Sequence, residues 1–271
     1  MQGGIDPETL EKELGPGWEV HNLALPMGSS ALQLHMILDS IREGDVIVMG
    51  ALPLSFYTDG ESPDLEQFGA KLPTTYGPAS MDLWITVTLQ DYLWFLRGRT
   101  SPAEEAHTLL RSLVVEPTPM DTAQGKIRPG KNGWLELQLE PGATFSADYD
   151  LDFAQRLEKS IRPDRAELFV EVLARLQADV ASVRASGGRE VFFVRLPSDH
   201  EFAATEERYY PRAEYWDKLS ATFPGHCWHF ADYPATRKLP TVDGSHLAGP
   251  DARRYSHWLG AQLREALKRD E

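Results

Sequence analysis

The chain has 271 residues, 42% of them hydrophobic, which is enough to form a globular core in one large domain or two small ones. Its 41 acidic residues outnumber its 27 lysines and arginines, and the net charge of −14 argues against nucleic acid or an anionic membrane surface as a partner. A single cysteine, Cys227, excludes an internal disulfide without identifying the compartment.

The first third of the chain is predicted to alternate helix and strand. Asp6 is a candidate N-cap for a helix over residues 8–14, and residues 18–25 are predicted to form a strand. Residues 31–42 carry apolar side chains at helical spacing. Residues 45–52 are almost wholly apolar and rich in β-branched residues, a pattern typical of a parallel strand that is buried on both faces.

The middle of the chain, residues 55–150, is less regular. We interpret it as an insertion, or cap, that covers one end of the sheet. Within it, residues 82–96 fit either a helix or a strand and residues 102–115 favour a helix. Residues 134–139 alternate in polarity, as a half-buried strand does.

Regular patterns return after residue 163. Helices are predicted over residues 164–185 and 211–221 and from Pro250 onward, and strands over residues 190–196 and 227–230. Strands that alternate with helices imply parallel crossovers. We therefore predict the α/β fold class, with a single domain over residues 1–271 built on an open parallel sheet. In such sheets the ligand binds at the carboxyl ends of the strands.

Asp243 and His246 are the most informative residues, because they lie three positions apart in a loop just before the last helix. An Asp that accepts a hydrogen bond from one ring nitrogen of a His fixes its tautomer, and the other nitrogen can then take a proton from a serine. The alternative is an Asx-turn with Gly244 beside a surface histidine. We favour the catalytic pair.

Other polar residues near the strands have simpler interpretations. Asp199, His200 and Glu201 follow a predicted strand at its carboxyl end, but we favour a solvated loop there. Arg195, inside that strand, either reaches the edge to bind an anionic group or pairs with an acidic residue.

No metal and no cofactor are expected. His226 and His229 flank Cys227, which suggests zinc. Successive residues of a strand point to opposite faces, however, so these three side chains cannot all converge on one ion.

Four segments of the chain match conserved blocks of a known enzyme family. They read GIDPETL at residues 4–10, NLALPMGSS at 22–30, DVIVMG at 45–50, and DGSHL at 243–247 with ARRY at 252–255. In this order they resemble the SGNH (GDSL-type) hydrolase superfamily, in the branch whose nucleophile motif reads Gly-Ser-Ser. The resemblance implies a flavodoxin-like, three-layer α/β/α fold and an esterase or acyltransferase reaction through a covalent serine intermediate.

The resemblance also implies roles for individual residues. His246 would be the general base and acid, Asp243 would orient it, and backbone N–H groups of Gly28 and Ser29 would stabilise the oxyanion. A helix N-terminus suits that last role, although plain N-capping by serine explains the same residues. Ser29 or Ser30 is a rival nucleophile, because Gly28-Ser29-Ser30 itself spells the branch motif.

The chain departs from the family pattern in two places. In the superfamily a first strand and the serine loop precede the segment equivalent to residues 4–10, so we expect the nucleophile upstream of Met1. The third block often reads Gly-x-Asn-Asp, whose Asn donates to the oxyanion, but Leu52 stands in that position here. Loss of one such donor typically lowers the rate by about 100- to 1000-fold.

Three functions remain open. The first is a serine hydrolase or acyltransferase whose substrate is a small-molecule or carbohydrate ester, or an acylated lipid. The second is a non-catalytic SGNH-like protein that binds a carbohydrate or a partner protein. The third, an unrelated flavodoxin-like binding domain, predicts that Asp243 and His246 lie far from residues 26–30.

The sequence contains no run of about 18 apolar residues, so we expect no membrane span in this chain. The first residues show no signal peptide. We expect a cytoplasmic protein from the chain as given, and a periplasmic or envelope protein if a further N-terminal segment precedes it.

Overall fold

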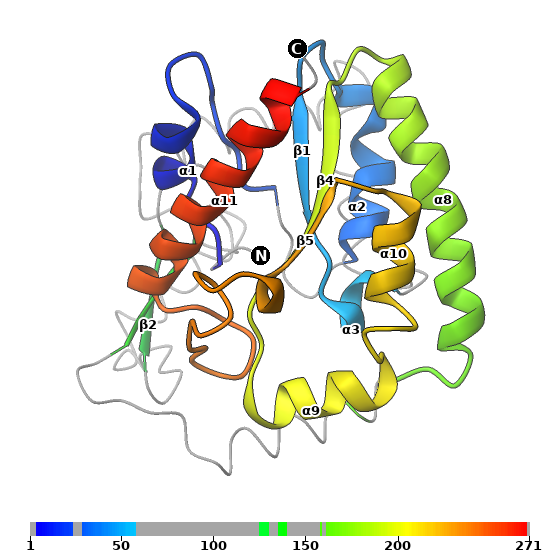
Figure 1. Cartoon of the computed structure of the whole chain (residues 1–271), viewed down its shortest axis with the longest axis vertical. Helices are drawn as coiled ribbons and strands as arrows, with labels where there is room; N and C mark the ends of the chain where they lie inside the picture. The colour runs from blue at the N-terminus through cyan, green and yellow to red at the C-terminus, as the bar shows by residue number, and fades with distance from the viewer. Residues whose placement is uncertain are drawn as a thin grey trace, which may run out of the picture.

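The computed structural model describes residues 4–23, 29–57, 158 and 161–269, together with the backbone of two strands between them. Its main sheet has three parallel strands in the order β1–β4–β5, which are β1 (Val46–Gly50), β4 (Glu190–Arg195) and β5 (Cys227–His229) (Figure 1). The central strand β4 places Val194 opposite Gly50 and Arg195 opposite His229. The predicted α/β class with parallel strands is therefore confirmed.

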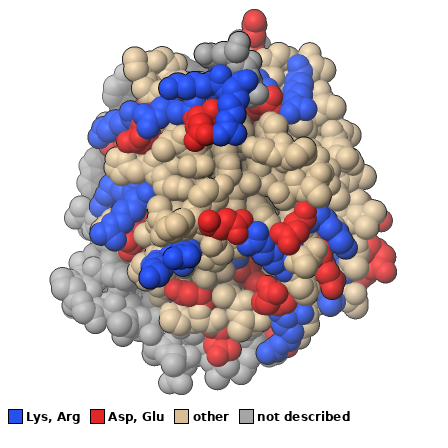
Figure 2. Space-filling model, in the orientation of Figure 1, with Lys and Arg blue, Asp and Glu red and all other residues tan. Residues whose placement is uncertain are grey.

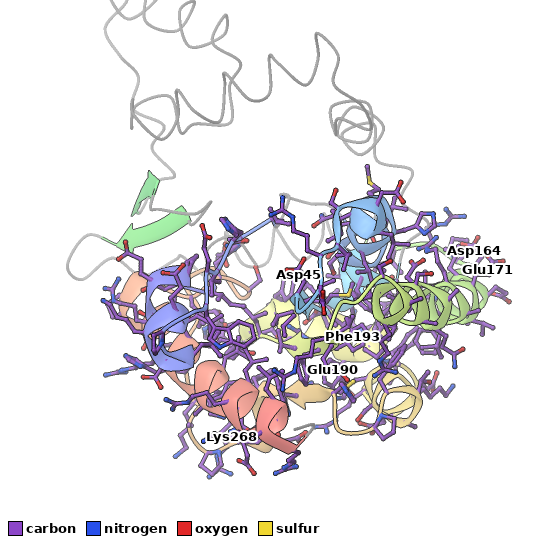
Figure 3. The ribbon with its side chains drawn as sticks, turned by 90° about the horizontal axis from the view of Figure 1, so that it is seen from above. Asp45, Asp164, Glu171, Glu190, Phe193 and Lys268 are labelled. Carbon is purple, nitrogen blue, oxygen red and sulfur yellow. The ribbon has the colours of Figure 1, made fainter. Side chains whose placement is uncertain are left out.

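Helices cover both faces of this sheet. They are α1 (Pro7–Leu14), α2 (Ser30–Ile37), α3 (Pro53–Phe56), α8 (Arg165–Ala185), α9 (His200–Tyr209), α10 (Trp216–Thr222) and α11 (Gly249–Arg269), with 3-10 helices at Leu38–Ser40 and Phe230–Asp232. Figures 1 and 3 show α1 and α11 on one face and α2, α8 and α10 on the other. Helix α9 crosses the end of the sheet at which the strands finish (Figure 1).

The side chains of β4 alternate between two hydrophobic cores. Val191 and Phe193, the latter labelled in Figure 3, pack with α2, α8 and α10, whereas Phe192 and Val194 pack with α1 and α11. All four side chains are almost completely buried. This double burial ties both helical layers to one strand. In β1, for which the sequence predicts burial on both faces, only Met49 and Gly50 are buried and the first three residues are half-buried.

Helix α1 begins as the sequence predicts. Asp6 is its N-cap and accepts the N–H of Glu8 at 3.1 Å, while the backbone N–H of Asp6 donates to Ser256 Oγ of α11 at 2.8 Å. The two helices approach closely at Gly260, where a Cβ would lie only 2.4 Å from Glu13 Cβ. A small residue at this crossing therefore lets α1 and α11 pack.

One predicted strand is wrong. Residues 18–23, the described part of the strand predicted over residues 18–25, form no strand. Trp18 and Val20 pack against the core shared with α11, and the Val20 N–H donates to Glu11 Oε1 at 2.8 Å. Residues 18–23 pair with no described strand, and the backbone of Val20 finds its partner in a side chain of α1 instead.

Helix boundaries also differ from the predictions. The helix predicted over residues 31–42 is α-helical only to Ile37 and continues as a 3-10 helix, and the helix predicted over residues 211–221 begins at Trp216. The solvated loop predicted at Asp199, His200 and Glu201 is wrong from His200 onward, because these residues open α9. Its buried face consists of Phe202, Thr205 and Glu206.

Two antiparallel strands, β2 (Gly125–Pro129) and β3 (Leu135–Leu139), lie within the predicted insertion. They pair with each other and are not part of the main sheet. β3 confirms the strand predicted over residues 134–139. The predictions for residues 82–96 and 102–115 lie outside the described residues.

Replacing Gly260 by Ala tests the contact between α1 and α11. In an exposed helix, Ala is more stable than Gly by about 1 kcal/mol, but here the added Cβ would collide with Glu13. We expect the free energy of unfolding of Gly260→Ala to fall by about 1–3 kcal/mol in urea denaturation. Ala261→Gly, on the exposed side of the same helix, is the control for helix propensity alone. A Gly260→Ala variant more stable than the wild type would contradict this packing.

Candidate active site

Two loops meet the carboxyl ends of neighbouring strands. Ser30 Oγ donates to the carbonyl of Gly50, the last residue of β1, at 2.5 Å. After β4, the backbone N–H of Asp199 donates to the carbonyl of Gly244 at 3.1 Å. Both loops therefore lie at the same edge of the sheet, the edge at which open parallel sheets bind ligands (Figure 1).

Asp243 and His246 form the predicted hydrogen-bonded pair. Asp243 Oδ2 lies 2.7 Å from His246 Nδ1, and Oδ1 accepts the backbone N–H groups of Ser245 at 3.1 Å and His246 at 2.8 Å. The carboxylate thus makes an Asx-type turn and also holds the imidazole, while the catalytic role of the pair stays a prediction. The Asp243 side chain is 13% exposed and the His246 side chain 52%, which leaves the ring accessible at the surface.

The charge of Asp243 suits it to orient a base. Burial of its carboxyl group opposes ionisation, but hydrogen bonds from the His246 ring and from the backbone of Ser245 and His246 outweigh burial and lower the pKa of Asp243 below its usual value. Asp243 is therefore an anion at neutral pH. An anionic acceptor at Nδ1 favours the tautomer protonated there and leaves Nε2 as the proton acceptor, which is the arrangement that a general base needs.

Ser245 contacts the imidazole on the side that a nucleophile would not use. Its Oγ lies 3.1 Å from His246 Nδ1 and 3.2 Å from Asp243 Oδ1. A serine activated by His246 approaches Nε2, because Nδ1 is occupied by Asp243. Ser245 therefore supports the pair and does not complete a triad.

The two serines of the predicted oxyanion loop have structural partners. Ser29 is buried and caps α2, since its Oγ accepts the N–H of Leu32 at 3.4 Å and donates to the carbonyl of Phe56 at 3.3 Å. In the part of the chain that the structure describes, neither Ser29 nor Ser30 is hydrogen-bonded to His246. N-capping and strand anchoring account for both hydroxyls, and their roles as oxyanion donor or nucleophile stay predictions.

The two other positions that the resemblance assigns to the oxyanion site are those of Gly28 and Leu52. Gly28 lies outside the described residues. Leu52 precedes α3, and its carbonyl accepts the N–H groups of Ser55 at 3.0 Å and Phe56 at 2.8 Å. Its apolar side chain offers no donor to an oxyanion, as the sequence predicts.

A buried ion pair lies at the end of β4. Arg195 pairs with Glu206 of α9, and both side chains are buried. Arg195 also donates to the carbonyl of Leu196 at 2.7 Å and to Ser198 Oγ at 2.8 Å. Of the two alternatives for Arg195, pairing with an acidic residue is the one found. Sequence reasoning missed Glu206, although its spacing from Phe202 on one helical face was a usable signal.

The residues around Cys227 have separate partners. His226 Nε2 lies 3.0 Å from Glu190 Oε2, whereas His229 Nδ1 accepts the N–H of Ala231 at 3.2 Å. Burial raises the pKa of Cys227 to about 12 and lowers the pKa of His229 to about 3. Within the described ranges, no group of three such side chains could hold a metal ion.

Half-exposed His–carboxylate pairs also occur elsewhere in the fold, so pairing alone does not mark the site. His35 Nδ1 lies 2.9 Å from Asp179 Oδ1, and His257 Nδ1 lies 2.8 Å from Glu13 Oε1. Those pairs join one helix to another, α2 to α8 and α11 to α1. The pair of His246 differs because it lies in a loop at the carboxyl edge of the sheet.

Charge is distributed unevenly over the surface seen in Figure 2. Lysines and arginines gather at the end of the molecule where α11 finishes, and its last turn carries Lys268 and Arg269. The carboxyl edge of the sheet lies at the opposite end, where acidic and basic side chains are mixed. Among the described residues seen on this face, no extended basic surface lies at that end of the molecule.

Comparison of the chain with known protein families, with curated proteins and with solved structures found no match. Among the described residues, no helix combines the length and the apolar character needed to cross a bilayer.

Asp243→Asn is expected to destabilise the protein in a pH-dependent way. Because the pKa of Asp243 is lower in the folded state, its charge stabilises the fold above the usual Asp pKa of about 3.9, and that stabilisation is lost as pH falls through the folded value. We expect a loss of about 1–2 kcal/mol at neutral pH that shrinks on acidification, measured by urea denaturation across pH. Asp217→Asn, which removes a half-exposed partner of Arg212, is the control. A loss independent of pH would contradict this role.

Glu206→Leu is expected to lower the free energy of unfolding by about 3–5 kcal/mol, because it leaves the guanidinium of Arg195 buried and unpaired. The double variant Arg195→Met/Glu206→Leu removes both charges and is expected to recover most of that loss. Chemical denaturation of the two variants and the wild type gives the free energies of unfolding that are compared. A double variant as unstable as the single one would show that the pair contributes through something other than charge.

Proposed function

We propose that this chain is an SGNH-type serine hydrolase or acyltransferase that acts on an ester and has a flavodoxin-like fold. The observation that carries the proposal is the Asp243–His246 pair, an acid and a base 2.7 Å apart in a half-exposed loop before the last helix. The loop lies at the carboxyl edge of a parallel sheet, where this class of fold binds its ligands. The four sequence blocks that resemble the superfamily support the same reaction.

The arrangement of the sheet supports the fold named in the proposal. Helices on both faces of parallel strands give the layering that a flavodoxin-like fold needs. Within the described part of the chain, β1 pairs only with β4, so its other edge can accept a further parallel strand. The superfamily resemblance implies such a strand, followed by the nucleophile serine.

Each residue then has a defined task. His246 Nε2 takes the proton of the serine hydroxyl as its oxygen attacks the ester carbonyl, and later returns that proton to the departing alkoxide. Asp243 stabilises the imidazolium that forms in between. Backbone N–H groups of Gly28 and Ser29 stabilise the oxyanion. Water releases the acyl group in a hydrolase, and the hydroxyl of a second substrate accepts it in an acyltransferase.

A non-catalytic SGNH-like binding protein is the second candidate. Two observations favour it: the hydroxyls of Ser29 and Ser30 are bound to backbone carbonyls, and Leu52 offers no oxyanion donor. In this alternative the same edge of the sheet binds a carbohydrate or a partner protein without turnover.

Labelling with a fluorophosphonate, which bonds covalently to activated serines, tests the proposal. The variant His246→Gln removes the proposed base, and His257→Gln removes a half-exposed histidine that also pairs with a carboxylate but joins α11 to α1. The proposal predicts that labelling is retained in His257→Gln and slowed by roughly 1000-fold or more in His246→Gln. Peptide mapping then identifies the modified serine.

The outcome also separates the two candidates. Labelling that appears only when residues encoded before Met1 are included would locate the nucleophile there, and labelling of Ser29 or Ser30 would assign it to the loop before α2. Either result supports the proposal if it depends on His246. Absence of labelling with and without preceding residues would overturn it in favour of the binding protein.

A further inference from the structure

Asp199 holds the loop that carries the Asp243–His246 pair. Its Oδ2 accepts the backbone N–H of Thr241 at 3.0 Å, and its Oδ1 accepts the Thr241 hydroxyl. Its own backbone N–H donates to the carbonyl of Gly244 at 3.1 Å. One residue therefore binds the loop on both sides of Asp243.

The loop packs tightly against the start of α9. Gly244 has a φ of +85°, and a Cβ at this position would lie only 2.6 Å from Phe202 Cβ. The N–H of Val242 donates to the carbonyl of His246 at 2.7 Å, which closes the loop on itself. The pair is thus fixed by contacts of its backbone with α9 as well as by its own side chains.

Asp199 is in turn fixed by the buried end of β4. Arg195 binds Glu206 of α9 and Ser198 Oγ, and so holds the turn that connects β4 to α9. His200, the next residue, has a φ of +52°, a left-handed conformation that is uncommon outside glycine. Such a conformation persists only where surrounding contacts impose it.

We infer that Asp199 is a positioning residue, which sets the place of the Asp243–His246 pair at the carboxyl edge of the sheet. The catalytic importance of this positioning rests on the proposed function. The geometry itself can be tested without measuring activity. Both carboxylate oxygens of Asp199 are engaged by Thr241, so Asp199 acts through the loop and does not itself exchange protons with a substrate.

Three substitutions separate positioning from general stability. Asp199→Ala removes both acceptors, Asp199→Asn keeps one carbonyl oxygen, and Glu201→Gln changes the neighbouring exposed acid of α9 as a matched control. Amide hydrogen exchange is followed at Ser245 and His246, whose N–H groups bond to Asp243. The amides of β4 report global stability in the same experiment.

We expect Asp199→Ala to accelerate exchange at Ser245 and His246 by roughly tenfold or more relative to the β4 amides, with partial recovery in Asp199→Asn and no change in Glu201→Gln. The Asp243 carboxyl group, followed by NMR, is expected to titrate at a higher pKa in Asp199→Ala, because the hydrogen bonds that lower it are loosened.

If Asp199→Ala does not fold, Thr241→Val gives a milder form of the same test, since it removes only the hydroxyl donor. Unchanged exchange at Ser245 and His246 in a folded variant would overturn the inference. A uniform acceleration of loop and β4 amides would overturn it too, because a purely structural role predicts that result.

Failure of the proposed function gives a different pattern. If the protein is not a hydrolase, fluorophosphonate labelling fails in the wild type while the exchange results for Asp199→Ala still stand. In an active hydrolase, Asp199→Ala lowers kcat more than it raises KM, because the base is misplaced while the substrate contacts remain.

Discussion

The carboxyl edge of this sheet is organised by strand β4, which is paired on both sides and buried on both faces. Its apolar residues need no polar partner, but its last residue, Arg195, brings a charge into the interior, and a buried charge is tolerated only when it is paired. Glu206 supplies the opposite charge and so fixes α9 across the end of the strand. The start of α9 is then in place to hold the loop that carries Asp243 and His246.

The position of the Asp243–His246 pair in the fold distinguishes it from the other His–carboxylate pairs. A carboxylate beside a half-exposed imidazole is a common surface contact, and on the flanks of the helices it only joins one helix to another. At the carboxyl end of parallel strands the same contact faces the region where ligands bind. There the anion at Asp243 favours a tautomer whose free nitrogen can accept a proton.

The two sides of the edge differ in what they contribute. On the β4 side, the loop with His246 presents a half-exposed imidazole that Asp243 holds by a hydrogen bond. On the β1 side, the hydroxyls of Ser29 and Ser30 are used to cap α2 and to anchor it to the strand. The proposed hydrolase needs a serine hydroxyl that faces Nε2, and in the described part of the chain neither Ser29 nor Ser30 is hydrogen-bonded to His246.

Local patterns determined much of this protein from the sequence alone. The N-cap at Asp6, the long helix α8, the buried strand β4 and the inward face of α11 all follow from spacing and polarity within one element. The Asp243–His246 pair was predictable for the same reason, since its members are three residues apart. Only the tertiary structure decided the rest. Residues 18–23 form no strand but pack against the core beside α11, where the Val20 N–H donates to Glu11. Asp199 meets Thr241 across 42 positions because β4, α9 and the loop before α11 converge at one edge of the sheet.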